Sequence, residues 1–288
     1  MFSVLWMIGA LASFCLMAIG GRELSEHLDT FQILFYRSVI GLIMVVAVIA
    51  STRQTHLFTT QRLHLHTFRN LFHFGGQFGW FKGIALLPLA EVFALEFTVP
   101  LWTALIACTF LNESLTREKL ISISLGLAGV LIIVQPGIAI INSASVIVLV
   151  AAICYAIAHS STKALSNTEH PLTILFMMCL IQLPIGLLLS LHDFQQPHGV
   201  DWLWLGIVGF TALSAHYCLT KAMTYTEVTL VVTMDFLRLP LIAVVGVLLY
   251  GEKFEIALLV GALLMLIGNL LNIYGNQTRA ADIPTTKK

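Results

Sequence analysis

Charged residues are scarce in this sequence. They make up 10% of the 288 residues, whereas 58% are hydrophobic; an ordinary soluble domain has roughly 25% charged residues. A soluble fold of this length would have no interior large enough to hide so much apolar surface. A membrane-spanning helix needs roughly 20 apolar residues, and about ten such runs follow one another here with short polar breaks. We therefore predict an all-α polytopic membrane protein with nearly the whole chain inside the bilayer.

Other absences narrow the class of function further. The formal net charge is zero, so the chain lacks the basic field that attracts nucleic acid. The cysteines lie in apolar runs without C-x-x-C pairing or a nearby ligand set, which predicts small core residues and no metal site. The sequence has no G-x-S-x-G turn, no H-E-x-x-H pair, no acidic metal-binding cluster and no large loop for a cofactor. An enzyme is therefore disfavoured, and no cofactor is expected.

The apolar runs predict the positions of the membrane spans. The chain begins with apolar residues and has no basic segment or small-residue cleavage signal before Gly20-Gly21-Arg22, so we interpret its start as a retained span. Between the third and fourth spans the break consists of Leu87-Pro88-Leu89-Ala90, which fits a tight turn or a kink. The predicted spans cover residues 2–20, 30–50, 67–87, 90–111, 118–136, 144–163, 171–191, 201–222, 227–250 and 256–275.

Lysine and arginine in the short loops indicate the orientation of these spans. With a cytoplasmic N-terminus, the outside loops hold little beyond Arg22 and Lys253. Both termini are therefore predicted to be cytoplasmic, in what we expect to be a bacterial inner membrane, and the polar tail 277–288 is predicted to be disordered. The inside loops and the tail then contain Arg53, Arg62, Arg117, Lys119, Lys163, Arg279, Lys287 and Lys288.

The chain contains an internal repeat. Charged residues are too scarce for several to coincide easily by chance, yet a shift of 139 residues aligns three charged pairs. This shift divides the chain into units 1–139 and 140–276 with an odd number of spans in each, so the second unit would enter the membrane upside down, as in many secondary transporters. The aligned pairs are Lys82 with Lys221, Glu96 with Asp235, Phe97 with Phe236, Glu113 with Glu252 and Gly129 with Gly268.

The repeated segments resemble a known family. Ala90-Glu91 through Pro100 to Leu105, followed by Phe110-Leu111-Asn112-Glu113, is similar to the EamA repeat of the drug/metabolite transporter superfamily. The second unit repeats this pattern with Asp235 to Pro240, Tyr250-Gly251-Glu252 and a glycine-rich following segment. Phe35-Tyr36-Arg37-Ser38 is similar to the arginine-bearing second helix of that family. Asn112 stands where the family more often has glycine.

The resemblance covers nearly the whole chain and implies both a fold and a function. It implies a ten-helix bundle of two inverted five-helix repeats that exports or exchanges a small polar or amphipathic metabolite through a central cavity. The form of residues 235–240 looks like a branch whose members handle varied amphipathic compounds, including S-adenosylmethionine-like and metallophore-like ones. It does not specify the substrate.

Ionisable residues within the predicted spans are the first candidates for a binding site, because each costs on the order of 3 kcal/mol at mid-membrane. The candidates that lie away from the ends of their spans are Arg37, Glu96, Asp235 and Arg238. We hypothesise that Glu96 and Asp235 mark the two ends of one cavity and that Arg238 binds an anionic group of the substrate through its planar donor fork. A carboxylate in a poorly hydrated cavity is also a candidate for proton uptake during transport, so proton or counter-substrate coupling is a further hypothesis.

A structural role is the alternative for these charges. Arg37 with Glu96, and Asp235 with Arg238, would then be intramembrane ion pairs that stabilise the bundle. The two roles are compatible with each other. The sequence leaves the choice open.

Several other polar side chains are candidate cavity residues. His73, Gln77 and Trp80 recur at helical spacing and so share one face of the third span. Trp80 and Tyr217 would suit an amphipathic or cationic substrate through aromatic contact. Interhelical hydrogen bonding and packing is the alternative for this group. Lys82 and Lys221 more readily place their ammonium groups at the membrane surfaces.

Residues at span ends complete the set. Glu113 and Glu252 lie at the ends of the fourth and ninth spans and are interpreted as helix-end or gate residues. The loop with His56, His64 and His66 has no carboxylate or cysteine to complete a metal site, and contact with solvent or with anionic membrane lipid fits it better.

Two further classes of function stay open on the sequence. A channel would need a polar path open to both sides, whereas off-centre charges in inverted repeats favour alternating gates. A membrane-embedded binding or assembly protein would bind a ligand without moving it. The substrate, the direction of transport, the coupling ion and the oligomeric state are not indicated by the sequence.

Overall fold

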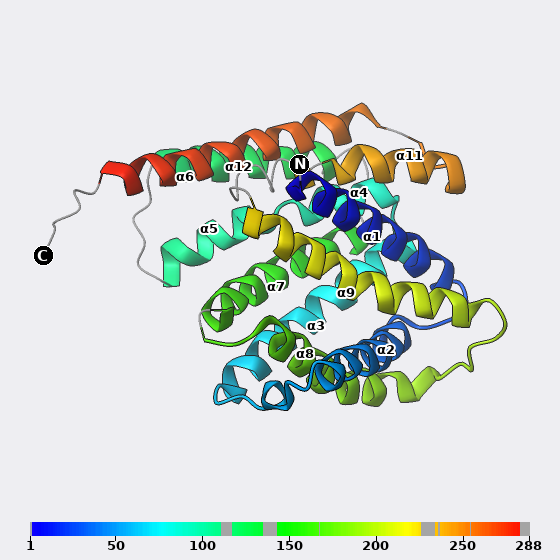
Figure 1. The fold of residues 1–288 in the computed structure, drawn as a ribbon. Coiled ribbons are helices and arrows are strands. Elements are labelled where there is room, and N and C mark those ends of the chain that lie inside the picture. The colour runs from blue at the N-terminus through cyan, green and yellow to red at the C-terminus, as the bar shows by residue number, and fades with distance from the viewer. Residues whose placement is uncertain are drawn as a thin grey trace, which may run out of the picture.

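The computed structural model describes residues 2–110, 117–134, 143–166, 168–225, 234–235, 237–253 and 255–282. Within these ranges the chain is built from helices and connecting loops, without strands, which confirms the predicted all-helical fold (Figure 1). The helices are α1 (Phe2–Leu24), α2 (Thr30–Ser51), α3 (Leu63–Leu86), α4 (Leu89–Glu96), α5 (Val99–Phe110), α6 (Arg117–Val134), α7 (Ser143–Ser166), α8 (Pro171–Ser190), α9 (Asp201–Tyr225), α11 (Arg238–Tyr250) and α12 (Ile256–Asp282).

Helix length and composition agree with insertion in a membrane. Four segments of the described chain are long and apolar enough to cross a bilayer, namely Val4–Leu24, Thr30–Ser51, Ser143–Thr162 and Pro171–Asp193. Large apolar side chains such as Leu248 and Leu188 lie exposed on the outside of the bundle. In water such a surface would be unfavourable, and lipid is the solvent that it fits.

Helices from the two ends of the chain pack against each other in pairs. Helix α1 packs on α9, α3 on α7, α2 on α8, α4 on α11, and α6 on α12. In Figure 1, α6 and α12 lie side by side along one side of the molecule and α2 and α8 lie at the opposite side, with the other pairs between them. Each pair joins one helix from the first half of the chain to one from the second half.

Glycines permit the closest of these contacts. On α3, a Cβ atom at Gly79 would lie 2.7 Å from the Cβ of Ala151 on α7. On α6, a Cβ at Gly129 would lie 2.6 Å from the carbonyl oxygen of Gly261 on α12. Both distances are too short for a real side chain, so the absence of one lets the helix backbones approach. Small residues serve this purpose in many membrane helix pairs.

The predicted fourth span, 90–111, is broken into two helices. Helix α4 ends at Glu96 and α5 begins at Val99. Pro100 lacks an N–H group and cannot donate to the carbonyl of Glu96, four residues earlier, which favours a break in the helix at this point. Proline is well tolerated where it now lies, in the first turn of α5. The predicted span therefore consists of two helices, α4 and α5.

The predicted ninth span, 227–250, has a similar interruption. Residues 234–235 are helical and α11 begins at Arg238. Pro240 cannot donate to the carbonyl of residue 236 for the same reason. Residues 226–233 and 236 lie outside the described residues. Both breaks lie beside charged residues predicted for the site.

The last helix is longer than predicted. Helix α12 continues to Asp282, whereas the tail was expected to be disordered from residue 277. Residues 283–288 lie outside the described residues. The helical part of the chain thus includes the first six residues of the predicted tail.

Candidate functional site

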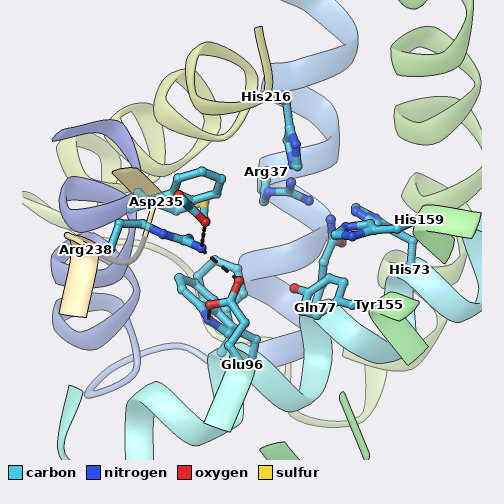
Figure 2. A pocket seen from close by; sticks show the side chains of 13 residues that line it. Arg37, His73, Gln77, Glu96, Tyr155, His159, His216, Asp235 and Arg238 are labelled. Atoms are coloured by element: carbon cyan, nitrogen blue, oxygen red, sulfur yellow. Dashed lines mark hydrogen bonds and ion pairs between the residues drawn. The ribbon is translucent and has the colours of Figure 1, made fainter. Parts of the chain in front are cut away.

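A buried cavity of about 130 Å³ lies among the central helices. It collects charged, imidazole and aromatic side chains from α1, α2, α3, α4, α7, α9 and α11, so residues far apart in the sequence face one space (Figure 2). The lining residues are Phe14, Met17, Arg37, His73, Gln77, Trp80, Phe81, Glu96, Tyr155, His159, His216, Asp235 and Arg238.

Arg238 lies between two carboxylates on one side of this cavity. Its Nη2 atom is 2.7 Å from Oδ2 of Asp235, and its Nη1 atom is 3.7 Å from Oε1 of Glu96. Asp235 belongs to the second half of the chain and Glu96 to the first. The two halves of the chain therefore meet at one guanidinium group. Glu96 is the last residue of α4 and Arg238 is the first residue of α11, so both lie at helix ends.

Aromatic side chains surround this charged cluster. The guanidinium carbon of Arg238 lies 4.4 Å from the ring centroid of Phe14, 5.2 Å from that of Phe97 and 5.5 Å from that of Phe93. The Nε1 atom of Trp80 donates a hydrogen bond of 2.8 Å to Oε2 of Glu96. Ring faces stabilise a cation in a site with little water, so Arg238 is stabilised by contacts on several sides.

Of the two ion pairs considered as a structural alternative, Arg37 with Glu96 and Asp235 with Arg238, the structure contains the second. Asp235 and Arg238 do form a pair. Glu96 pairs with Arg238 and not with Arg37, for which the described part of the chain offers no ion pair. Glu96 and Asp235 also share one partner on one side of the cavity (Figure 2), whereas we had expected them to mark its two ends.

A second group of polar side chains faces the cavity from the other side (Figure 2). His73 and Gln77 on α3 line it as predicted, and the Nδ1 atom of His73 is 3.1 Å from Nε2 of Gln182. Tyr155 and His159 on α7 line it too, although sequence reasoning missed both. The sequence contained a pattern that could have identified them: they are four residues apart in a largely apolar run, so they share one face of a helix.

Tyr217 does not line this cavity, unlike the other residues predicted to bind substrate. Its side chain is 50% exposed on the outside of α9 and packs edge-on against Trp6, with ring centroids 5.8 Å apart. The preceding residue, His216, faces the cavity instead. One residue turns an α-helix by about 100°, and this rotation separates the two neighbours.

Glu252 connects three elements at one end of the bundle. It pairs with Arg22 at the end of α1, with 3.1 Å between Nη2 and Oε1. It also accepts hydrogen bonds from the backbone N–H of Leu89 at the start of α4, with Oε2 at 2.9 Å. The contact places Glu252 at a junction where elements close over the bundle, beside a second cavity of about 300 Å³ that Glu91 and Glu255 also line. Glu113 lies outside the described residues.

Together, the apolar helices and the charged cavity among them define a polytopic membrane protein with a polar site between its helices. A family model for the EamA-like transporter family matches residues 1–135 and again residues 142–274. The chain belongs to this family. This confirms the resemblance deduced from the repeated segments, and it confirms that the chain belongs with transporters and not with enzymes.

Proteins of known function give the same class. The S-adenosylmethionine uptake transporter of Rickettsia felis is 22% identical over 94% of this chain and 92% of its own. The riboflavin transporter of Brucella anthropi is 29% identical over 82% and 87%, and the pseudopaline exporter CntI of Pseudomonas aeruginosa is 24% identical over 91% and 93%. These relatives support a membrane transporter of small metabolites.

A solved crystal structure supports the fold. It superimposes on 97% of this chain and 98% of its own with a TM-score of 0.65, at 17% sequence identity. At that identity the likeness concerns the arrangement of helices alone. The helical architecture described above is therefore found in an experimentally determined protein.

Proposed function

We propose that this protein is a secondary active transporter that exports or exchanges a small polar or amphipathic metabolite by alternating access. The observation that most directly supports this is the contact of Arg238 with carboxylates from both halves of the chain, inside a cavity. Buried charges in membrane helices are unfavourable unless they have a function or a partner. A site formed between two halves is also one that a relative movement of the halves can open.

The helix pairs support two related repeats. Suppose that each helix of the second half repeats one of the first: α7 repeats α1, α8 repeats α2, α9 repeats α3, α11 repeats the pair α4 and α5, and α12 repeats α6. Exchanging the two halves then converts the α1–α9 contact into the α7–α3 contact. The pairs α2–α8, α4–α11 and α6–α12 turn into themselves. A twofold axis between the halves would generate this pattern. With an odd number of spans in each half, that axis would lie in the plane of the membrane.

The loop contacts support the proposed threading. Arg22 reaches Glu252, which joins two loops predicted to be outside. Gln195, in another loop predicted to be outside, donates its backbone N–H to Gln32 at the predicted outer end of α2. Arg62 donates to the carbonyl of Ala164, which joins two loops predicted to be inside. The excess of lysine and arginine in the inside loops then puts both termini in the cytoplasm, in an inner membrane.

The junction at Glu252 would serve as a gate on the outer side. Arg22, Leu89 and Glu252 belong to three different elements, and their contacts close the bundle there. Opening this side requires the ion pair to break, since the elements cannot separate while it holds. Glu113 would serve the corresponding role on the other side through the repeat.

Glu96 and Asp235 would also couple transport to a proton or to a counter-substrate. Both carboxylates face the cavity beside one arginine. A change of protonation at either changes the net charge that the substrate meets, and opposite charges within about 4 Å interact strongly in a poorly hydrated site. The names of the relatives, which include transporters of S-adenosylmethionine and riboflavin and an exporter of pseudopaline, suggest amphipathic candidates for the substrate.

Counterflow in proteoliposomes tests this proposal. Liposomes containing the full chain are loaded with unlabelled S-adenosylmethionine, riboflavin or compounds that accumulate in cells lacking the protein, and entry of the labelled compound is measured. A carrier should accumulate label faster when the inside is loaded, and Asp235→Asn should reduce this while Tyr217→Phe should not. Label entry that ignores the internal load would indicate a channel. Binding without any flux would indicate a membrane-embedded binding protein.

A further inference from the structure

Arg37 is a buried cation without a carboxylate partner in the described part of the chain. It lines the central cavity and is 5% exposed, and its Nε atom has no hydrogen-bond partner. Arg238 also has an Nε atom without a hydrogen-bond partner, but unlike Arg37 it has two carboxylates within 4 Å. Removing a guanidinium from water without a countercharge is strongly unfavourable, so the cation in this cavity that still requires an anion is Arg37.

Gln77 also lines this cavity and also has buried polar atoms without hydrogen-bond partners. Its side chain is 3% exposed, and neither Oε1 nor Nε2 has a hydrogen-bond partner. Buried amide groups almost always have partners. Figure 2 shows Gln77 directed into the space between the two sides of the site, with Arg37 above that space. The two side chains together offer guanidinium and amide N–H donors, which suit the oxygens of a carboxylate or phosphate.

The opposite side of the cavity needs a donor or a cation. Oδ1 of Asp235 is buried and has no hydrogen-bond partner, while Oδ2 is bonded to Arg238. Glu96 adds a second carboxylate at this side. Together they hold two negative charges against the single positive charge of Arg238. An ammonium or similar cationic group would satisfy Oδ1 and balance the excess.

The charges of the described lining residues balance when the histidines are neutral. The described residues around the cavity include two arginines, Arg37 and Arg238, and two carboxylates, Glu96 and Asp235. A ligand with net charge would leave an uncompensated charge in a medium that solvates it poorly. A ligand with one negative and one positive end keeps the balance and satisfies both sides.

We propose that the transported metabolite is dipolar, with its anionic group on Arg37 and Gln77, its cationic group on Asp235 and Glu96, and its apolar part against Phe14. This rests on the proposed transport function and assigns the anion to Arg37, in place of the Arg238 expected from the sequence. Arg238 then acts as the group that holds the two carboxylates in place.

Compounds that differ by one charged group test the assignment. Binding of L-phenylalanine, L-phenylalaninamide and N-acetyl-L-phenylalanine to the purified full chain is measured by thermal shift and titration, as is binding of S-adenosylmethionine and its decarboxylated form. A charged hydrogen bond is worth a factor of about 10 to 100 in affinity. We expect each carboxylate-bearing parent to bind about 10- to 100-fold more tightly than its carboxylate-free form, and phenylalanine to bind more tightly than its N-acetyl form.

Variants identify the side chains responsible. Arg37→Gln should abolish the preference for the carboxylate, Arg37→Lys should retain part of it, and Asp235→Asn should abolish the preference for the free ammonium. Arg69→Gln is the matched control, because Arg69 is another buried arginine but donates to Thr162 and Asn70 and does not line the cavity. The preference is a ratio within one variant, so a loss of folded protein does not imitate it.

The outcomes separate this inference from the transport function. Equal binding of the parent compounds and their amide or decarboxylated forms would overturn it, as would a carboxylate preference that survives Arg37→Gln, or no binding of either parent. Flux in liposomes together with any of these results would support the transport function and reject the dipolar binding site. Selective binding without flux would support the dipolar binding site and reject the transport function.

Discussion

The stability of the Arg238 cluster gives the sharpest test of the structure. Arg238→Ala would leave Glu96 and Asp235 facing the same cavity without their shared countercharge. Removing one partner of a buried ion pair costs about 3–5 kcal/mol. The carboxylate side chains here remain 19% and 20% exposed, so we place the loss at the lower end, about 3 kcal/mol.

The same cluster predicts a rescue. Adding Asp235→Asn and Glu96→Gln to Arg238→Ala removes the uncompensated charges, so the triple variant should be more stable than the single one. Non-additivity of this kind is the signature of residues in direct contact. Of the two carboxylates, Asp235 at 2.7 Å should contribute more to the coupling than Glu96 at 3.7 Å.

Equilibrium unfolding in mixed micelles, followed by tryptophan fluorescence, measures both effects. Tyr217→Ala serves as a control because it removes an aromatic side chain from the outer surface of α9. A loss below about 0.5 kcal/mol for Arg238→Ala, which is the range of ordinary surface substitutions, would refute the ion-paired cluster. A triple variant less stable than Arg238→Ala would refute the electrostatic reason for it.

Three other predictions concern threading, packing and the gate. In a background without native cysteines, cysteines at Lys82 and Lys221 should react with membrane-impermeant reagent from opposite sides, and reaction from one side alone would contradict the inverted repeat. Gly79→Val should destabilise the α3–α7 contact by about 1–3 kcal/mol, as overpacking does. Gly206→Val is the control and should have no such effect, because a Cβ there meets open space. Equal effects of the two substitutions in the same unfolding assay would contradict the close approach of α3 and α7. Arg22→Gln should increase labelling from the outside of a cysteine at Ala90, which is 8% exposed and lines the second cavity with Glu252. Unchanged labelling would argue against a gate there.

Most of the fold could be predicted from composition and spacing. Long apolar runs fix helices because a bilayer leaves no other way to satisfy the backbone, so the predicted spans 30–50 and 171–191 agree closely with α2 and α8. The breaks at residues 97–98 and just before Arg238 were missed although Pro100 and Pro240 were visible. A proline within an apolar run is compatible with a kink or with a full interruption, and neighbouring helices decide which one forms.

The site was predicted in part, for a similar reason. Helical spacing correctly placed His73, Gln77 and Trp80 on the cavity, because one helix determines their common face. The partner of Glu96 could not be predicted, since it depends on which helices pack together, and Arg238 lies 142 residues away in the sequence. Tyr217 was misplaced because a single residue decides which side of α9 a side chain takes.

Helix α4 is held at both ends by the other half of the chain. Its first N–H, at Leu89, donates to Glu252, and its last residue, Glu96, contacts Arg238. Covalently, this eight-residue helix belongs to the first half and is separated from α5 by the interruption at residues 97–98. Any movement that parts the halves must break both contacts or carry α4 away with α11 and bend the chain at that interruption. The boundary between moving bodies would then run through residues 97–98 and would not follow the midpoint of the sequence.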